Sequence, residues 1–174
     1  MATAEFGFET TTLDMEGNVT KTAPYNAITV SAIQEVLPAF QGKIMQVPPI
    51  FSALKKDGKK LYEVAREGGT EADLQIEARE VEVYRLALVH PESIQLPRFD
   101  IEIECGGGTF VRSLIRDIAH KLGTVATTAG LKRTKQGQFS LEDCLSKEDW
   151  SADNIFAEVE RHNRLRADEK DETE

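Results

Sequence analysis

The sequence predicts an α/β (α+β) fold, because segments that alternate apolar and polar residues are interspersed with segments in which apolar residues recur at helical spacing. Residues 99–105 alternate apolar side chains with acids, as a half-buried strand does. Residues 109–122 repeat apolar side chains every three or four positions, which is typical of an amphipathic helix. The glycine run 106–108 between them predicts a tight turn that joins this strand to this helix.

The first forty residues predict a hairpin followed by a helix. Residues 4–12 alternate in the manner of a strand, and residues 14–17 have the composition of a turn. Thr29 is a favourable N-cap for a helix over residues 30–40, whose apolar residues recur at helical spacing. Pro38 should kink or end that helix.

Four further elements follow along the chain. The pair Pro48 and Pro49 forces an extended segment, and residues 59–67 predict a short amphipathic helix that ends before a glycine. Residues 81–88 alternate in two phases, which a β-bulge would join. Residues 151–166 predict a final helix.

The composition indicates a soluble protein of a reducing compartment. No apolar run approaches the roughly 20 residues that span a bilayer, and the amino terminus lacks the pattern of a targeting peptide. The two cysteines, Cys105 and Cys144, are too few and too far apart for a disulfide framework or a zinc site. His90, His120 and His162 lack ligand-like spacing, so we expect no metal. We expect the cytoplasm or nucleus, or an organelle if a leader precedes this segment.

The overall charge argues against an RNA-binding protein, although its distribution weakens the objection. The formal net charge is -9 and the sequence pI is about 5.0, whereas phosphate contacts require positive charge. Acids gather in residues 168–174, which read as a solvated tail. Basic side chains gather instead in residues 55–66, so one basic face on an acidic protein is compatible with the sequence.

Two ordered motifs resemble the TruB family of tRNA pseudouridine synthases. The first is Gln46–Gly68, QVPPIFSALKKDGKKLYEVAREG, and the second is Cys105–Asp117, CGGGTFVRSLIRD. The turn Thr10–Gly17 and the segment Leu131–Thr134 extend the resemblance from about residue 4 to about residue 145. The lysine-rich string of the first motif is of the TruB type rather than of the related dyskerin-like branch.

The resemblance implies a fold, a reaction and a set of partners. It implies a mixed, mainly antiparallel sheet flanked by helices, with residues 1–145 as the C-terminal portion of a pseudouridine synthase catalytic domain. Residues 146–166 would form a terminal helix and residues 167–174 an acidic disordered tail. The implied reaction isomerises uridine to pseudouridine in the TΨC arm of tRNA, without cofactor or metal. The complete protein would be a monomer that binds the TΨC stem-loop and no membrane.

The resemblance also assigns four candidate residues to the active site. Arg112 would pair with the catalytic aspartate, and Phe110 would stack on the target uracil in place of the usual tyrosine. Leu131 would close the same pocket, and Asp14 would lie in a turn near the cleft. Without the resemblance, Arg112 would be a solvated arginine, Phe110 and Leu131 would be core residues, and Asp14 an ordinary turn residue.

Basic residues of the same motifs are candidates for binding the phosphates of a hairpin-shaped RNA, which requires positive charge rather than a base code. These candidates are Lys55, Lys59, Lys60, Arg66, Lys132 and Arg133. A solvated helix face explains the first four equally well by composition.

The catalytic aspartate implied by the resemblance belongs to a Gly-Thr-Leu-Asp-Pro-like segment, and no acid of this chain occupies such a context. We therefore expect the chain alone to be inactive and expect the N-terminal half of the catalytic domain as a partner. Two alternatives stay open. The chain would be a non-catalytic RNA-binding or RNA-chaperone module if it had lost the nucleophile, or a structural or interaction domain with a degenerate fold, which its acidity suits.

Overall fold

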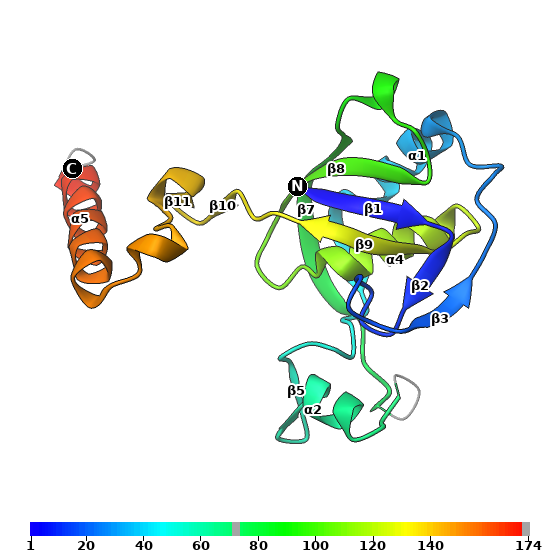
Figure 1. The fold of residues 1–174 in the computed structure, drawn as a ribbon, viewed down its shortest axis with the longest axis horizontal. Coiled ribbons are helices and arrows are strands. Elements are labelled where there is room, and N and C mark those ends of the chain that lie inside the picture. Colours follow the sequence, from blue (N-terminus) through cyan, green and yellow to red (C-terminus); the bar gives the residue numbers. More distant parts are fainter. Residues whose placement is uncertain (71–73, 172–174) are drawn as a thin grey trace. The chain divides into compact units, whose positions relative to one another are not determined.

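The computed structural model describes all residues except 71–73 and 172–174, and only the backbone of residues 165–171 (Figure 1). The chain divides into two compact units, Met1–Lys132 and Arg133–Glu174. The division falls after Lys132, whereas the sequence placed its first boundary at residue 145. Each unit is described by itself.

The first unit is built on a five-stranded sheet in which every pair of neighbouring strands is antiparallel. This confirms the α/β fold with a mainly antiparallel sheet. The strands, in spatial order, are β4 (Gly42–Gln46), β7 (Arg79–Leu88), β8 (Arg98–Cys105), β1 (Ala2–Phe6) and β9 (Ala126–Leu131).

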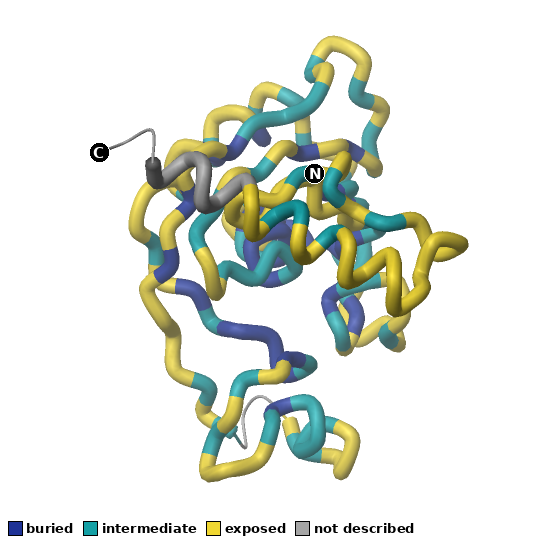
Figure 2. Tube along the Cα trace, turned by 90° about the vertical axis from the view of Figure 1, so that its left-hand side faces the viewer, coloured by how far each residue is buried: buried dark blue, intermediate teal, exposed yellow. Residues whose placement is uncertain are grey.

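Helices cover one face of this sheet and enclose the core. Helix α1 (Val30–Val36), the 3₁₀ helix η1 (Leu37–Phe40) and helix α4 (Val111–Lys121) pack against the strands. Buried positions gather in the sheet and in α4 (Figure 2). Full burial of one aliphatic side chain contributes about 1.5–3 kcal/mol. The buried core includes Phe6, Ile33, Val83, Phe99, Ile101, Leu114 and Ile118.

Local sequence signals place several of these elements. Thr29 caps α1 by accepting a hydrogen bond from the Ala32 backbone N–H at 3.1 Å. The α-helix ends at Val36, and Pro38 lies in the following 3₁₀ turn, as predicted. In β7 the register against β8 shifts between Val83 and Arg85, which confirms the bulge that the two alternating phases predicted.

The predicted hairpin is present, and a glycine separates it from the main sheet. Strands β2 (Phe8–Thr10) and β3 (Val19–Thr22) pair with each other, while β1 joins the five-stranded sheet. Gly7 has a φ of +107°, and a Cβ there would lie 3.2 Å from the ring of Tyr25. The bend between β1 and β2 therefore requires glycine at this position.

A second hairpin carries the lysine-rich motif. Strands β5 (Lys55–Lys56) and β6 (Lys59–Lys60) are joined by Asp57 and Gly58, both with positive φ, as a type I′ turn requires. Helix α2 (Leu61–Arg66) follows and is shorter than the predicted helix, because residues 59 and 60 pair as a strand. We call β5, β6 and α2, residues 55–66, the basic segment.

The second unit consists of short elements and one long helix. Its elements are β10 (Lys135–Gln136), β11 (Phe139–Ser140), the 3₁₀ helices η3 (Leu141–Asp143) and η4 (Lys147–Asp149), and α5 (Ala152–Asp171). Helix α5 continues past the predicted end at residue 166, since Ala, Glu and Lys favour helix. Residues 172–174 of the predicted acidic tail lie outside the described residues.

Candidate active site

The two motifs that are distant in sequence meet at the beginning of α4. Gln46, the last residue of β4, is 1% exposed. Its Oε1 accepts a hydrogen bond from the Phe110 backbone N–H at 2.8 Å, and its Nε2 donates to the Phe110 carbonyl at 3.2 Å. One amide side chain therefore binds both polar backbone groups of Phe110.

Two further side chains of α4 hold the segment that follows Gln46. Ser113 Oγ donates to the Val47 carbonyl at 3.0 Å, and Arg116 Nη2 donates to the same oxygen at 3.2 Å. Both side chains are buried. The extended run through the two prolines is thus fixed to the first turns of α4.

Arg112 joins three separate segments by hydrogen bonds from its guanidinium group. Nη1 donates to Asp14 Oδ2 at 2.7 Å and to the Thr12 carbonyl at 2.7 Å, and Nη2 donates to the Phe51 carbonyl at 3.0 Å. The side chains of Arg112 and Asp14 are 25% and 26% exposed, so the ion pair is largely shielded from water. Such partial shielding makes an ion pair stronger than one on an open surface.

Asp14 is itself oriented by its own turn. Its Oδ1 accepts hydrogen bonds from the hydroxyl of Thr12 and from the backbone N–H of Glu16, an arrangement typical of aspartate in tight turns. Asp14 also forms an isolated parallel bridge with Thr128 of β9. Both carboxylate oxygens are therefore occupied, and the partner that the structure gives Arg112 is an acid of this chain.

Phe110 occupies the N-cap position of α4 and is partly exposed. Its backbone is extended, with φ of -96° and ψ of 105°, so the helix begins at Val111 rather than at the predicted Thr109. Phe110 lies outside the hydrophobic core of the first unit. Phe110 is therefore a partly exposed aromatic residue two positions before Arg112, which fits a role in stacking.

Leu131 lies at the end of β9 and is 57% exposed. It pairs with Ala2, and Thr128 of the same strand bridges to Asp14. The structure therefore places the strand of Leu131 beside the Arg112 cluster, with Leu131 itself on the surface rather than in the core.

Three buried hydroxyls of the same segments have no hydrogen-bond partner among the described residues. They belong to Ser52, Thr109 and Thr128. A buried hydroxyl without a partner is uncommon in folded proteins. Ser52 follows Phe51, Thr109 precedes Phe110 and Thr128 bridges to Asp14, so all three are neighbours of residues in this site.

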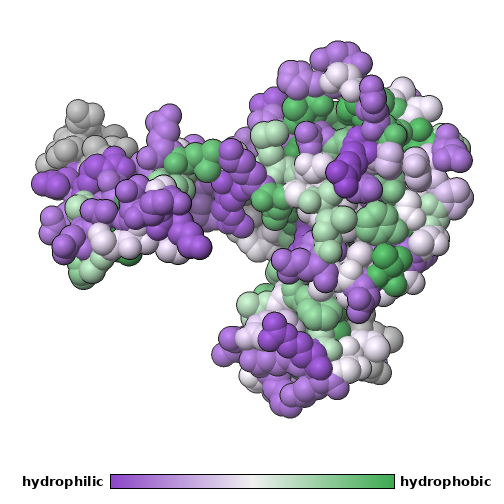
Figure 3. All heavy atoms as spheres, in the orientation of Figure 1, coloured by the Kyte–Doolittle hydropathy of each residue, from purple (hydrophilic) through white to green (hydrophobic). Residues whose placement is uncertain are grey.

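The basic segment presents charges that are organised around Tyr62. Lys60 Nζ donates to the Tyr62 hydroxyl at 3.2 Å, which raises the pKa of Lys60, and Arg66 lies over the Tyr62 ring at 5.3 Å. Lys59 pairs with Glu67 at 3.4 Å, and both are exposed. Hydrophilic residues gather on this segment, at the bottom of the view in Figure 3.

The two remaining basic candidates fall in different units. Lys132 ends the first unit, where its backbone N–H donates to the Met1 carbonyl at 2.9 Å. Arg133 begins the second unit and contacts Gln136. The structure therefore does not assign the two residues to one surface.

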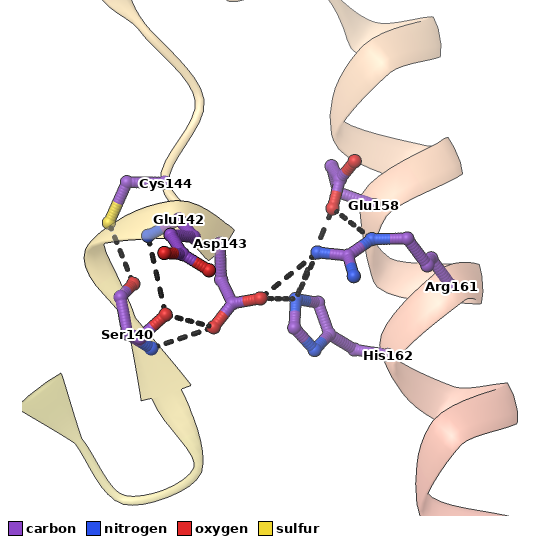
Figure 4. Close-up of polar contacts among 7 residues, drawn as sticks. All are labelled: Ser140, Glu142, Asp143, Cys144, Glu158, Arg161 and His162. Carbon is purple, nitrogen blue, oxygen red and sulfur yellow. Dashed lines mark hydrogen bonds and ion pairs between the residues drawn. The ribbon is translucent and has the colours of Figure 1, made fainter.

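The second unit contains a polar cluster of its own (Figure 4). Hydrogen bonds to Asp143 from the Ser140 backbone N–H, from Arg161 and from the Ser140 hydroxyl lower the pKa of Asp143 to about 2. A pocket of about 290 Å³ adjoins this cluster. We place the candidate active site at Arg112 instead, because the two motifs that are distant in sequence meet there.

Sequence reasoning selected Arg112, Phe110 and Asp14 as candidates but gave no role to Gln46, Thr12 or Ser113. Gln46 binds the backbone of Phe110, the Thr12 carbonyl accepts from Arg112, and Ser113 donates to the Val47 carbonyl. A polar residue at the end of an otherwise buried strand was the available signal for Gln46. None of the described helices has the length and apolar composition needed to cross a membrane. The described residues also hold no cluster of three potential metal ligands.

The fold resembles that of one chain in a solved protein complex. A chain in the crystal structure of a Cbf5-Nop10-Gar1 complex aligns with a TM-score of 0.54 at 23% identity, covering 85% of this chain and 33% of the other. At this identity the likeness shows the fold alone.

Sequence comparison gives the family. Residues 1–111 match the family described as TruB family pseudouridylate synthase (N terminal domain). The chain is 42% identical over 165 residues to pseudouridylate synthase TRUB1 of Homo sapiens, covering 94% of this chain and 46% of that protein. It is 38% identical over 148 residues to tRNA pseudouridine synthase B of Nostoc, covering 85% and 50%. The chain belongs to the TruB family of pseudouridine synthases, and spans about half the length of these relatives.

Proposed function

We propose that this chain contributes the arginine and the stacking ring of a tRNA pseudouridine synthase active site that isomerises uridine in the TΨC arm. The observation that carries the proposal is the guanidinium of Arg112, fixed by Asp14, Thr12 and Phe51, two positions along the chain from the partly exposed Phe110. The names of the human and Nostoc relatives support the reaction, and the latter supports tRNA as the substrate.

Arg112 has two further N–H donors that could bind a second carboxylate. Nη1 makes two hydrogen bonds and Nη2 one, and no hydrogen bond from Nε or from the second Nη2 proton reaches any described residue. Nε and Nη2 lie along one edge of the planar guanidinium, and a bidentate carboxylate binds such an edge. Arg112 would therefore hold Asp14 with one edge and the nucleophilic aspartate with the other.

In the proposed reaction a flipped uridine stacks on Phe110 while that aspartate attacks. The bond from the ribose to N1 of uracil breaks and a bond to C5 forms. The proton on C5 is lost and N1 gains one, so the reaction is an isomerisation and needs no oxidant or reductant. Arg112 would fix the direction from which the carboxylate approaches.

Asp14 is a positioning residue in this scheme rather than the nucleophile. Its Oδ1 accepts hydrogen bonds from Thr12 and Glu16 and its Oδ2 accepts one from Arg112, so the carboxylate is held within its own turn, where it orients the guanidinium. We therefore propose that the isolated chain does not turn over uridine. A fusion that supplies a Gly-Thr-Leu-Asp-Pro-like segment before residue 1 should do so.

Release of tritium from [5-³H]uridine in a TΨC stem-loop tests the proposal directly. We expect release by the fusion and none by the isolated chain. Turnover by the homogeneous isolated chain would overturn the assignment of Asp14 as a positioning residue. No release by a folded fusion that binds the stem-loop would overturn the proposed reaction.

The basic segment favours RNA binding without catalysis as a second candidate function. Lys60 and Arg66 surround the ring of Tyr62 on a hairpin that carries further lysines, and basic groups with an aromatic ring can follow an RNA backbone. Salt-sensitive binding of the stem-loop by both proteins, with no turnover by the fusion, would favour this function.

A further inference from the structure

We infer that Gln46 is a positioning residue that sets the direction of the Phe110 ring and thereby the geometry in which the target base stacks. The inference rests on the proposed function, because it assigns Phe110 to the base. Gln46 acts on the Phe110 ring indirectly, through its hydrogen bonds to the Phe110 backbone.

The position of Phe110 in the helix explains why such a residue is needed. An N-cap residue normally satisfies a free backbone N–H of the first turn with its own side-chain oxygen, and phenylalanine has none. No side-chain cap is present at α4. Phenylalanine is therefore an unfavourable residue for the N-cap of α4. Its presence there fits a role other than capping the helix.

Gln46 supplies the polar groups that Phe110 lacks. The Phe110 carbonyl accepts from the Leu114 backbone N–H at 3.0 Å, as the first bond of the helix, and also from Gln46 Nε2. The Phe110 N–H lies before the helix and donates to Gln46 Oε1. The peptide units on both sides of the Phe110 Cα are therefore fixed by one buried side chain.

The backbone sets the direction of the Cα–Cβ bond of Phe110, and the ring can occupy only the rotamers that this direction allows. Core phenylalanines such as Phe6 and Phe99 are at most 4% exposed, and their rings pack on each other, whereas Phe110 is partly exposed. The direction of its Cα–Cβ bond follows from backbone dihedrals that Gln46 holds. A displacement of about 1 Å at a reacting centre can cost about 100-fold in rate, so this constraint matters to stacking.

The matched pair Gln46→Met and Thr127→Val separates positioning from simple stabilisation. Methionine has a similar length but makes neither hydrogen bond. Thr127 is also fully buried, and its Oγ1 donates to the Phe8 carbonyl at 3.0 Å, so its replacement removes a comparable buried bond away from Phe110. We expect both variants of the full chain to lose stability, and only Gln46→Met to affect Phe110.

Amide hydrogen exchange of the full chain without RNA gives the first measurement. The Phe110 N–H loses its acceptor, Gln46 Oε1, in the Gln46→Met variant. In that variant the exchange rate of the Phe110 amide should therefore increase at least about 10-fold more than the exchange rates of neighbouring amides. In Thr127→Val it should match the parent after the change in global stability is allowed for. Unchanged relative protection in Gln46→Met would overturn the inference.

The second measurement uses a TΨC stem-loop with 5-fluorouridine at the target position. Stacking on Phe110 should shift the ¹⁹F resonance through the ring current in the parent and in Thr127→Val, and Gln46→Met should lose at least half of the shift. The Kd should stay within about 3-fold, because phosphate contacts dominate affinity. A full shift in Gln46→Met would overturn the inference.

A third variant keeps the inference testable if Gln46→Met does not fold. A protonated glutamate has one O–H donor and one acceptor oxygen, as the amide has here, whereas its ionised form has only acceptors. Gln46→Glu should therefore keep the Phe110 N–H protected in both forms, and the ¹³C shift of the Phe110 carbonyl should return towards that of the parent as the pH falls and the O–H donor forms; absence of that return would overturn the inference. A parent that does not bind the stem-loop would contradict the proposed function alone, because the exchange measurement needs no RNA.

Discussion

Arg112 and Asp14 are 98 positions apart in the sequence, and a 2.7 Å hydrogen bond joins Arg112 Nη1 to Asp14 Oδ2. The pair connects the first turn of α4 to the loop between β2 and β3. Because the same guanidinium also binds the Thr12 and Phe51 carbonyls, one side chain determines how three segments meet. The stability and the proposed chemistry of the first unit therefore depend on the same contact.

Arg112→Lys should slow the proposed reaction more than it weakens binding. Lysine keeps the positive charge but loses the planar fork, so it cannot hold Asp14 and a second carboxylate with defined edges. In the fusion we expect the single-turnover rate to fall at least about 10-fold, which corresponds to about 1.4 kcal/mol. The affinity for the stem-loop should be nearly unchanged.

Arg116→Lys is the matched control, one turn along α4. Arg116 is buried and donates to the Val47 carbonyl, so its replacement should lower the Tm with a smaller effect on the rate. A larger loss of rate in Arg116→Lys than in Arg112→Lys would contradict the placement of the active-site arginine.

Asp14→Asn should destabilise the first unit. The amide loses the charge that pairs with Arg112 and offers one acceptor oxygen where the carboxylate offers two. Hydrogen bonds to charged groups contribute about 1.5–3 kcal/mol, so the free energy of unfolding in urea should fall by about that amount. Asp57→Asn makes the same chemical change in a type I′ turn that favours asparagine, and should leave the stability unchanged. Equal stabilities of the two variants would show that the Arg112 pair contributes nothing.

The double change Lys59→Glu and Lys60→Glu should weaken binding of the stem-loop and make binding less sensitive to salt. Each lost phosphate contact reduces the slope of log K against log[salt] by about 0.7–0.9. Lys21→Glu with Lys43→Glu changes the same charge at exposed positions on β3 and β4 and should retain the parent slope. Equal slopes for the two double variants would make the basic segment an ordinary solvated surface.

Acid should open the Asp143 cluster of the second unit. The folded pKa of Asp143 is lowered to about 2 from an ordinary 3.8, so its contribution to stability is complete above about pH 4 and is lost as the pH falls towards 2. The indole NMR signal of Trp150, the only tryptophan of the chain, reports on the same unit. We expect this signal to change over that range in the parent and less in Asp143→Asn. Identical profiles would show that Asp143 does not govern the acid response.

Local patterns predicted the elements of the fold well, because their physical causes are local. The alternation of residues 99–105 became β8, the Thr29 cap began α1, and Pro38 lies beyond its end. The pairing of strands that are distant in the sequence could not be predicted from local patterns. The order of the five strands depends on pairings between segments up to a whole domain apart, which a periodicity of two does not encode.

The candidate site shows the same limit. The residues with distinctive chemistry, Arg112 and Phe110, could be selected from their motif. The groups that hold them could not, because Gln46 binds backbone atoms 64 positions away, and any polar residue near a strand end has the same local signature. Asp14 was identified as a turn residue, and its pairing with Arg112 required the structure.

The short stretch from Gln46 to Ser52 has a consequence for the size of the RNA that fits. It touches Phe110 at one end and Arg112 near the other, and the Ser52 carbonyl accepts a hydrogen bond from the Tyr62 N–H at 3.1 Å at the base of the basic segment. One continuous stretch of backbone thus connects the surface proposed to bind phosphates with the ring proposed to receive a base. If both proposals hold, this stretch would set the number of nucleotides between the bound stem of an RNA hairpin and its flipped uridine.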